Sequence, residues 1–319
     1  MFKKEIDIIM SNFNGEKWIS QAIESIINQT FRNFNLIIID DGSTDESVKI
    51  INSFSDQRIH LVRNKNIGLT NSLIYGASLG CSKWIARIDS DDICHKERFE
   101  KQINFLNNNK EVILLGSNFK LIDENGKILK KKIYRYDDKR LKKNLLNMGK
   151  FFPHSSSIFR RDCYQNVGGY NKYIKKSQDY DLWLRLINQG SFYIHSDLLV
   201  SIRIHNKQIS YLNKKDQFFY SNMSQTLFWI RKFNQSDPSK LKDEDFSKFY
   251  KYFNQQYKQK NFHYYFNIYY NLRTFYKNKY IISDILNILV SVWFFNNKQK
   301  FLKKIAINWN MKIYTKLLI

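Results

Sequence analysis

The sequence predicts an α/β fold in which a mostly parallel sheet is flanked by helices and followed by a helical C-terminal extension. Three observations support this prediction. Short apolar runs alternate with segments whose apolar residues recur every 3.6 positions, several of these runs end in polar or acidic residues, and the alternation stops near residue 215. Strands that alternate with amphipathic helices indicate right-handed crossovers between parallel strands.

The first half of the chain contains four such strand and helix units. The run at residues 36–39 is apolar at every position, as in the middle of a parallel sheet. A hydroxyl in the segment 42–45 is well placed to cap the helix that follows it. The expected strands are 6–10, 36–39, 59–62 and 84–88, and the expected helices are 16–29, about 48–51, 69–77 and 96–107.

Beyond residue 110 the pattern changes to that of a hairpin, so the second half of the sheet is expected to be mixed. The elements predicted there are strands at 112–115 and 119–122, a turn over Asp123–Gly126 leading to Ile128, a strand near 156–159, a loop at Gly168 and Gly169, and a helix that opens at Gln178.

The length and the charge of the chain exclude only some classes of function. The 319 residues are 43% apolar, which is enough for the packed core of one large domain with or without an appendage. The formal net charge of +23 suits nucleic acid, an anionic membrane surface or anionic substrates, and composition does not choose among them.

The cysteines and the N-terminus indicate a reducing compartment. Cys81, Cys94 and Cys163 are odd in number and form no C-x-x-C pair, so neither a disulfide framework nor a zinc knuckle is suggested. The first residues run into a charged strand instead of a long apolar segment, so no signal peptide is expected. The catalytic part is therefore expected in the cytosol.

Polar and acidic side chains follow three of the four predicted parallel strands. Because ligands of such sheets bind at the carboxyl ends of the strands, we expect one site assembled from distant pieces. Two aspartates spaced two apart face the same way, and hard oxygen ligands suit Mg²⁺ or Mn²⁺ bound partly through a substrate's phosphates. A solvated acidic turn that caps the helix near His95 is the alternative for the third cluster. The three clusters are Ser11 and Asn12, Asp40 and Asp41, and Asp89, Asp91 and Asp92.

Six motifs, in this order and spacing, resemble the inverting family 2 glycosyltransferases, which have the GT-A fold. They are IIMSNFN, IIIDDGSTDES, NKNIGLTNSL, IARIDSDD, GGYN and SQDYDLWLRL. The resemblance covers about residues 3–212 and implies a nucleotide-diphosphate-sugar donor.

The resemblance implies that the donor is bound by residues at the strand ends and in the glycine loop. A carboxylate at Asp41 can accept a hydrogen bond from the ring N–H of a uracil-type base, which favours a UDP-sugar; a turn or capping carboxylate is the alternative. Phe13 stands where the family often has Tyr, and Ser11 where it often has Pro or Thr. The donor-binding residues expected on this basis are Ser11, Phe13, Asn14, Asp41, Asp89 and Gly169.

For the metal, Asp91 resembles the family's metal ligand, and Asp92 is a second candidate. A divalent ion, Mn²⁺ or Mg²⁺, would bridge the two phosphates and stabilise charge on the leaving nucleoside diphosphate. His205 resembles the C-terminal histidine that supplies a further ligand in many GT-A enzymes. A solvent-exposed histidine in a basic loop is the alternative for His205.

For the base, Asp179 resembles the acidic residue at the start of the acceptor-side helix, although Gln178 replaces the commoner Glu before it. In an inverting transfer one carboxylate removes the proton of the acceptor hydroxyl. Asp181 is assigned to the stability of the helix N-terminus. Further candidates for contact with the acceptor or the phosphates are His154, Arg161, Lys65 and Arg87.

The C-terminal part, residues 216–319, is expected to be a basic, aromatic, helical region distinct from the glycosyltransferase domain at 1–215. Residues 246–319 contain thirteen Lys and Arg against one acid, Asp284. The apolar stretch 280–295 is shorter than the ~20 residues that span a bilayer. The segment 302–317 is typical of a helix on anionic lipid, and packing on the first domain or on a second protomer in a homo-oligomer is the alternative.

These observations predict a metal-dependent inverting hexosyl- or N-acetylhexosaminyl-transferase. By family likeness, it would extend a glycan or lipid-linked glycan for a bacterial capsule or lipopolysaccharide, at the inner face of the cytoplasmic membrane. A catalytically inactive basic protein that binds a membrane surface or nucleic acid is the alternative. We expect no nucleic-acid partner, because three acidic clusters would repel a phosphate backbone. A dinucleotide oxidoreductase is disfavoured because no G-x-G-x-x-G follows the first strand.

Overall fold

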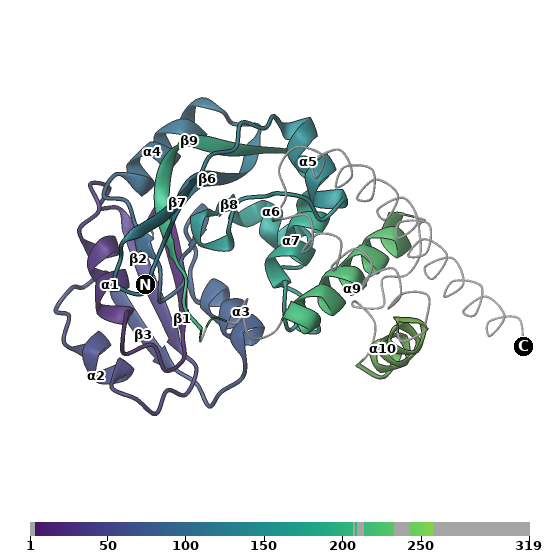
Figure 1. Cartoon of the computed structure of the whole chain (residues 1–319), viewed down its shortest axis with the longest axis horizontal. Helices are drawn as coiled ribbons and strands as arrows, with labels where there is room; N and C mark the ends of the chain where they lie inside the picture. Colours follow the sequence, from purple (N-terminus) through teal and green to yellow (C-terminus); the bar gives the residue numbers. More distant parts are fainter. Residues whose placement is uncertain (1–3, 207, 209–213, 233–242, 258–319) are drawn as a thin grey trace, which may run out of the picture. The chain divides into compact units, whose positions relative to one another are not determined.

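The computed structural model describes residues 4–206, 208, 214–232 and 243–257. The chain divides into two compact units, Met1–Gln217 and Phe218–Ile319. The first unit contains the sheet and is drawn from purple to teal in Figure 1.

A nine-stranded mixed sheet forms the centre of the first unit, which agrees with the predicted fold class. Its strand order is β3-β2-β1-β4-β8-β6-β9-β5, and β7 pairs with β6 outside this path. The first four strands are mutually parallel, as the alternation with helices predicts. They are β1 (Ile6–Asn12), β2 (Phe34–Asp40), β3 (Ile59–Arg63) and β4 (Trp84–Arg87).

Helices cover both faces of this parallel part. Alternate residues of β1 and β2, such as Ile8 and Ile38, join one core with Ile23 of α1 and Phe99 of α4. On the other face, Gly76 of α3 lies so close to Ile9 that an added Cβ would be 2.8 Å from its Cγ2. The sheet therefore lies between two helical layers, as Figure 1 shows for α1 and α3. The helices of this half are α1 (Ile19–Ile27), α2 (Ser47–Asn52), α3 (Leu69–Leu79) and α4 (Arg98–Asn108).

The second half of the sheet is mixed, as expected, but one prediction about its strands was wrong and one strand was not predicted. The segments 112–115 and 119–122 belong to one strand, β6 (Val112–Ile122), because Ser117 and Asn118 between them are buried and hydrogen-bonded. The sequence analysis also missed β9 (Ser191–Arg203), which pairs in parallel with β6. Its mixture of exposed, half-buried and buried positions gives no clean alternation.

The smaller elements of this half were predicted in part. The turn at Asp123 is confirmed, since Gly126 has φ +90° and its N–H donates to the Asp123 carbonyl. The expected hydroxyl cap is absent, because Ser43 instead donates to Asp40 and α2 has no side-chain cap. The remaining elements are β5 (Ile93–Cys94), β7 (Ile128–Lys132), α5 (Asp138–Leu146), the 3₁₀ turn η1 (His154–Ser156), β8 (Ile158–Arg160), α6 (Arg161–Asn166) and α7 (Gln178–Leu186).

Two helices make up the rest of the described chain, α9 (Lys214–Lys232) and α10 (Asp243–Tyr257). In α10, Phe246, Phe249 and Phe253 are buried and recur at helical spacing, which gives the helix one apolar face. None of the helices described here is at once long and apolar enough to cross a bilayer. The expectations for residues 280–295 and 302–317 lie outside the described residues.

Candidate functional site

Three predicted polar clusters meet at one edge of the sheet because β2, β1 and β4 are parallel neighbours. Asn12, at the end of β1, donates from Nδ2 to Oδ1 of Asp40 at 3.1 Å. The Asp41 N–H donates to the Asn12 carbonyl at 2.8 Å. Directly beyond β4 the chain turns through Asp89, Asp91 and Asp92 toward β5.

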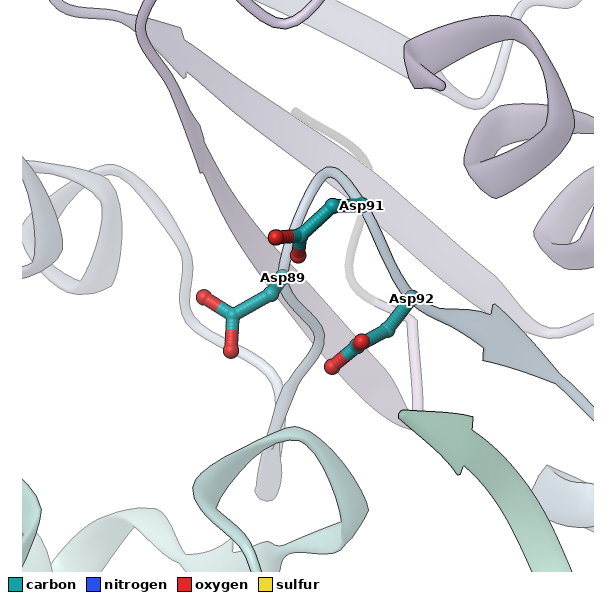
Figure 2. A group of neighbouring side chains, drawn as sticks. All are labelled: Asp89, Asp91 and Asp92. Atoms are coloured by element: carbon teal, nitrogen blue, oxygen red, sulfur yellow. The ribbon is translucent and has the colours of Figure 1, made fainter. Parts of the chain in front are cut away.

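Asp89, Asp91 and Asp92 form a compact group of carboxylates. One oxygen from each lies within 4.8 Å of the others. All three side chains leave the loop on the same side, as Figure 2 shows. Asp92 is buried, whereas Asp89 and Asp91 are partly exposed. The group is therefore accessible and rich in hard oxygen donors.

The three carboxyls do not share one electrostatic environment. Burial, together with the negative charges of Asp91 and Asp89, raises the pKa of Asp92 well above its ordinary value. Burial also opposes ionisation of Asp89, but the Arg87 guanidinium and the Ser155 hydroxyl outweigh it, so the pKa of Asp89 is lowered. Three carboxylates in one accessible group supply the oxygen donors that a hard divalent cation prefers.

His205 contacts this cluster from the loop after β9. Its Nε2 lies 2.9 Å from Oδ2 of Asp91, and its side chain is only 5% exposed. Its ring packs on Trp18 with the centroids 4.1 Å apart. Among the described residues, Nδ1 has no hydrogen-bond partner. The alternative of a solvent-exposed histidine is therefore wrong. His205 is held where it and Asp91 could bind the same metal ion.

Arg203, which the sequence analysis missed, fixes the position of this loop. Its side chain is fully buried and donates to the carbonyl of Asp91 at 2.9 Å, to the carbonyl of Glu124 at 2.7 Å and to Oε1 of Gln21 at 2.8 Å. An arginine two positions before His205, in an otherwise apolar run, was the available signal. Its donors tie the carboxylate loop, the β6–β7 turn and α1 together.

The expected donor-side residues lie in the loops that follow β1 and β2. Asp41 is buried, and its two oxygens accept the N–H groups of Ile67 and Gly68, both at 2.8 Å. Each carboxylate oxygen has two lone pairs, so Asp41 can order this loop and still accept a further N–H. The Phe13 side chain is 51% exposed, and Asn14 accepts the Thr44 N–H at 2.9 Å. Ser11 is the one partly exposed residue of β1.

Gly169 has φ +67°, and an added Cβ would lie 2.8 Å from the Tyr164 hydroxyl. Its carbonyl accepts a hydrogen bond from Arg185. The positive φ and the nearby Tyr164 hydroxyl therefore require glycine at this position, whether or not a sugar contacts it. Contact between Gly169 and a sugar stays a prediction.

Asp179 lies in the first turn of α7 and is partly exposed. Burial raises the pKa of its carboxyl above the ordinary value of 3.8, and the charge of Arg87 opposes that rise. The negative charge of Asp89 also acts on it, so Asp179 lies within electrostatic range of the carboxylate cluster. Asp181 is buried and pairs with Arg185 one helical turn later, at 2.7 Å.

Two of the further candidates have structural partners. Arg161 donates to Asp7 and to the carbonyls of Ala77 and Ser82, so it is not available to an acceptor or a phosphate. His154 is buried and lies 2.8 Å from the Tyr170 hydroxyl. Burial and the charge of Arg87 hold the pKa of His154 well below its ordinary value, so its ring is neutral near pH 7.

The other two candidates differ in exposure. Lys65 is exposed in the loop after β3. The Arg87 side chain is only 2% exposed and pairs with Asp89. The structure thus brings Asp89, Asp91, Asp92 and His205 together, and Arg87 belongs to the same cluster.

Sequence comparisons identify related proteins. The family described as "Glycosyl transferase family 2" matches residues 7–168. An uncharacterized glycosyltransferase of Methanocaldococcus jannaschii is 34% identical over 240 residues, which cover 73% of this chain and 82% of that protein. An uncharacterized glycosyltransferase of Haemophilus influenzae is 30% identical over 223 residues, covering 66% and 69%.

Solved structures of S. aureus TarS share the fold. The complex of TarS residues 1–349 with UDP-GlcNAc has a TM-score of 0.59 at 15% identity and covers 71% of this chain and 66% of that one. The complex with UDP has the same TM-score at 14% identity, with coverage of 97% and 92%. At this level of identity the similarity concerns the fold.

Proposed function

The chain belongs to glycosyltransferase family 2, and from that premise we propose that it transfers one sugar from a nucleotide-diphosphate sugar to a hydroxyl of a glycan or lipid-linked glycan. The observation that carries this proposal is the cluster of Asp89, Asp91 and Asp92 at the edge where three parallel strands end. We propose inversion at the anomeric carbon and a hexosyl or N-acetylhexosaminyl group as the transferred sugar.

Asp91 and His205 are the proposed metal ligands, with Asp92 as a second carboxylate. The 2.9 Å contact between Asp91 and His205 and the small exposure of His205 support this assignment. When bound, Mn²⁺ or Mg²⁺ would neutralise charge on the departing nucleoside diphosphate. Arg203 holds the backbone of Asp91 and so fixes the direction from which this carboxylate would reach the metal ion.

Asp179 is the proposed general base. A general base must attract the proton of the acceptor hydroxyl, and the raised pKa of Asp179 strengthens its attraction for a proton. Because Asp179 comes from α7 and the metal ligands come from the β4–β5 loop and from the loop after β9, the acceptor would bind between these elements. The acceptor hydroxyl would then lose its proton to Asp179 as its oxygen attacks the anomeric carbon.

A UDP-sugar is the favoured donor. TarS, which shares the fold, has been solved with UDP and with UDP-GlcNAc. Asp41 retains lone pairs for a uracil N–H, and the exposed Phe13 ring offers a face on which a base can stack. Ser11, Asn14, Asp89 and Gly169 complete the proposed donor side.

The proposed setting is the inner face of the cytoplasmic membrane, in synthesis of a cell-surface polysaccharide such as a capsule or lipopolysaccharide. Thirteen basic residues against one acid in residues 246–319 support attraction to anionic lipid. A lipid-linked acceptor would be presented at that surface.

Donor hydrolysis tests the proposal. The purified full chain is incubated with a panel of nucleotide-diphosphate sugars, with and without Mn²⁺, and release of the nucleoside diphosphate is measured. We expect hydrolysis of a UDP-sugar that requires the metal and is lost in Asp91→Asn. The matched control is Asp197→Asn, which removes a carboxylate that is 42% exposed and pairs with Lys101 at the surface.

Two results would contradict the proposal. Metal-dependent hydrolysis that persists in Asp91→Asn would show that Asp91 is not required as a metal ligand. No hydrolysis of any donor, together with salt-sensitive DNA binding that Asp91→Asn leaves unchanged, would instead support an inactive basic binding protein.

A further inference from the structure

Arg87 differs from three other buried arginines in how few of its guanidinium nitrogens donate hydrogen bonds. In Arg98, Arg161 and Arg203, each of the three guanidinium nitrogens donates a hydrogen bond. In Arg87 only Nη2 donates, to Oδ1 of Asp89. Among the described residues, its Nε and Nη1 have no partner, although the side chain is only 2% exposed.

A buried guanidinium with unmet donors is unfavourable for stability. The other three arginines connect distant segments through backbone carbonyls, whereas Arg87 bonds to a residue only two positions away. Arg87 therefore adds little as a cross-link. What it supplies is a positive charge beside Asp89.

Asp89 is held at both of its oxygens. Arg87 binds Oδ1, and the Ser155 hydroxyl donates to Oδ2 at 2.7 Å. The Asp89 N–H in turn lies 3.0 Å from the Ser155 oxygen. Each Asp89 oxygen retains one lone pair, but Arg87 and Ser155 together fix the direction in which the carboxylate presents it.

Asp91 is held differently. Its Oδ2 contacts His205 at 2.9 Å, and its Oδ1 has no hydrogen-bond partner among the described residues. The two carboxylates are neighbours in the cluster, yet among the described residues both oxygens of Asp89 have hydrogen-bond partners and only one oxygen of Asp91 has one.

We propose that Arg87 is a positioning residue that keeps Asp89 out of the metal's coordination shell, so that Asp89 faces the donor while Asp91 holds the cation. This inference rests on the proposed metal site. Losing the Arg87 charge would leave Asp89 free to turn toward the cation as an added ligand. Metal binding would then tighten, and donor binding would weaken.

Mn²⁺ titration of the full chain without donor tests this, with free Mn²⁺ measured by electron paramagnetic resonance. We expect Arg87→Met to bind Mn²⁺ about tenfold more tightly than the wild type, within the range that residues behind the ligands exert. Arg87→Lys keeps the charge and should stay near the wild type. With Mn²⁺ saturating, KM for a UDP-sugar should rise in Arg87→Met more than kcat falls.

The double variant Arg87→Met with Asp89→Asn separates positioning from plain charge repulsion. If Arg87 acts through Asp89, adding Arg87→Met to Asp89→Asn should leave Mn²⁺ affinity nearly unchanged. An equal tightening in both backgrounds would overturn the inference, as would unchanged affinity in Arg87→Met. If Arg87→Met fails to fold, Ser155→Ala releases the other Asp89 oxygen and should tighten Mn²⁺ binding in the same direction; no change there would also overturn it.

The same Mn²⁺ titration distinguishes failure of this inference from failure of the proposed function. If Mn²⁺ binding is lost in Asp91→Asn but is unchanged in Arg87→Met and Ser155→Ala, only the proposed role of Arg87 is overturned. A wild-type chain that binds no Mn²⁺ would overturn the metal site, and the role of Arg87 with it.

Discussion

Asp89 and Asp92 lie three positions apart on one loop, yet their surroundings shift their pKa values in opposite directions. Burial raises both pKa values, but the charge of Arg87 together with the Ser155 hydroxyl outweighs it at Asp89, whereas at Asp92 the negative charges of Asp91 and Asp89 add to it. The sequence predicts a cluster of carboxylates here, because three acids follow one buried strand. It does not reveal the direction of each pKa shift or which oxygen lacks a partner, since these also depend on contacts with Ser155 and His205, which are distant in the sequence.

At the scale of single residues, Asp179→Asn is expected to lower kcat for sugar transfer by about 10²–10⁴-fold, the usual contribution of a general base. KM for the donor should change little, because Asp179 acts on the acceptor. Steady-state transfer to an acceptor glycan, with Asp197→Asn as the matched control, measures both constants. An Asp179→Asn enzyme that keeps most of its kcat would show that another group removes the proton.

The pH dependence follows from the same residue. Only the ionised carboxylate of Asp179 can accept a proton, so activity is expected to fall as the pH drops through its pKa. Because burial raises that pKa above 3.8, the acidic limb of kcat/KM should have its midpoint above 3.8. A pH profile of the wild type checks this, and residual activity of Asp179→Asn should lack the limb. A midpoint below 3.8 would contradict the assignment.

At the scale of helices and strands, prediction from the sequence succeeded where the signal was local. The four parallel strands and their helices were identified because their apolar residues repeat at strand or helix spacing. The continuous β6 was not, because the buried polar residues Ser117 and Asn118 interrupt its apolar pattern, and β9 was not, because its buried and exposed positions do not alternate regularly. Arg203 ends β9 and His205 follows it. His205 could therefore be predicted only from the resemblance to the family, and Arg203 was not predicted.

An ion pair between β1 and the residue that follows β8 provides a stability prediction for these elements. Asp7 of β1 is fully buried and pairs with Arg161, just after β8, at 2.7 Å. Arg161→Met leaves this carboxylate without its cation and should cost about 3–5 kcal/mol of unfolding free energy. Arg160→Met, next to it, breaks the pair with Asp162, which is 61% exposed, and should cost less than about 1 kcal/mol. Urea unfolding measures both; equal losses would contradict the structural role of Arg161.

At the scale of the whole molecule, the chain is strongly basic although the proposed site is rich in carboxylates. The chain has 52 Lys and Arg against 29 Asp and Glu. The proposed site gathers acids, whereas residues 246–319 hold thirteen basic residues and one acid. A segment that is strongly basic and contributes none of the proposed site residues favours attraction of the chain to an anionic surface.

Vesicle binding of the full chain tests this separation. We expect it to co-sediment with vesicles that contain anionic phosphatidylglycerol and not with pure phosphatidylcholine vesicles, because each basic residue near an anionic surface contributes about 1 kcal/mol. Binding should weaken as NaCl is raised from 0.05 to 0.5 M, since salt shortens the range of the attraction. Asp91→Asn should bind vesicles as the wild type does, because Asp91 lies in the acidic site. Equal binding to both vesicle types, or binding that salt leaves unchanged, would mean that charge does not hold the chain at the membrane.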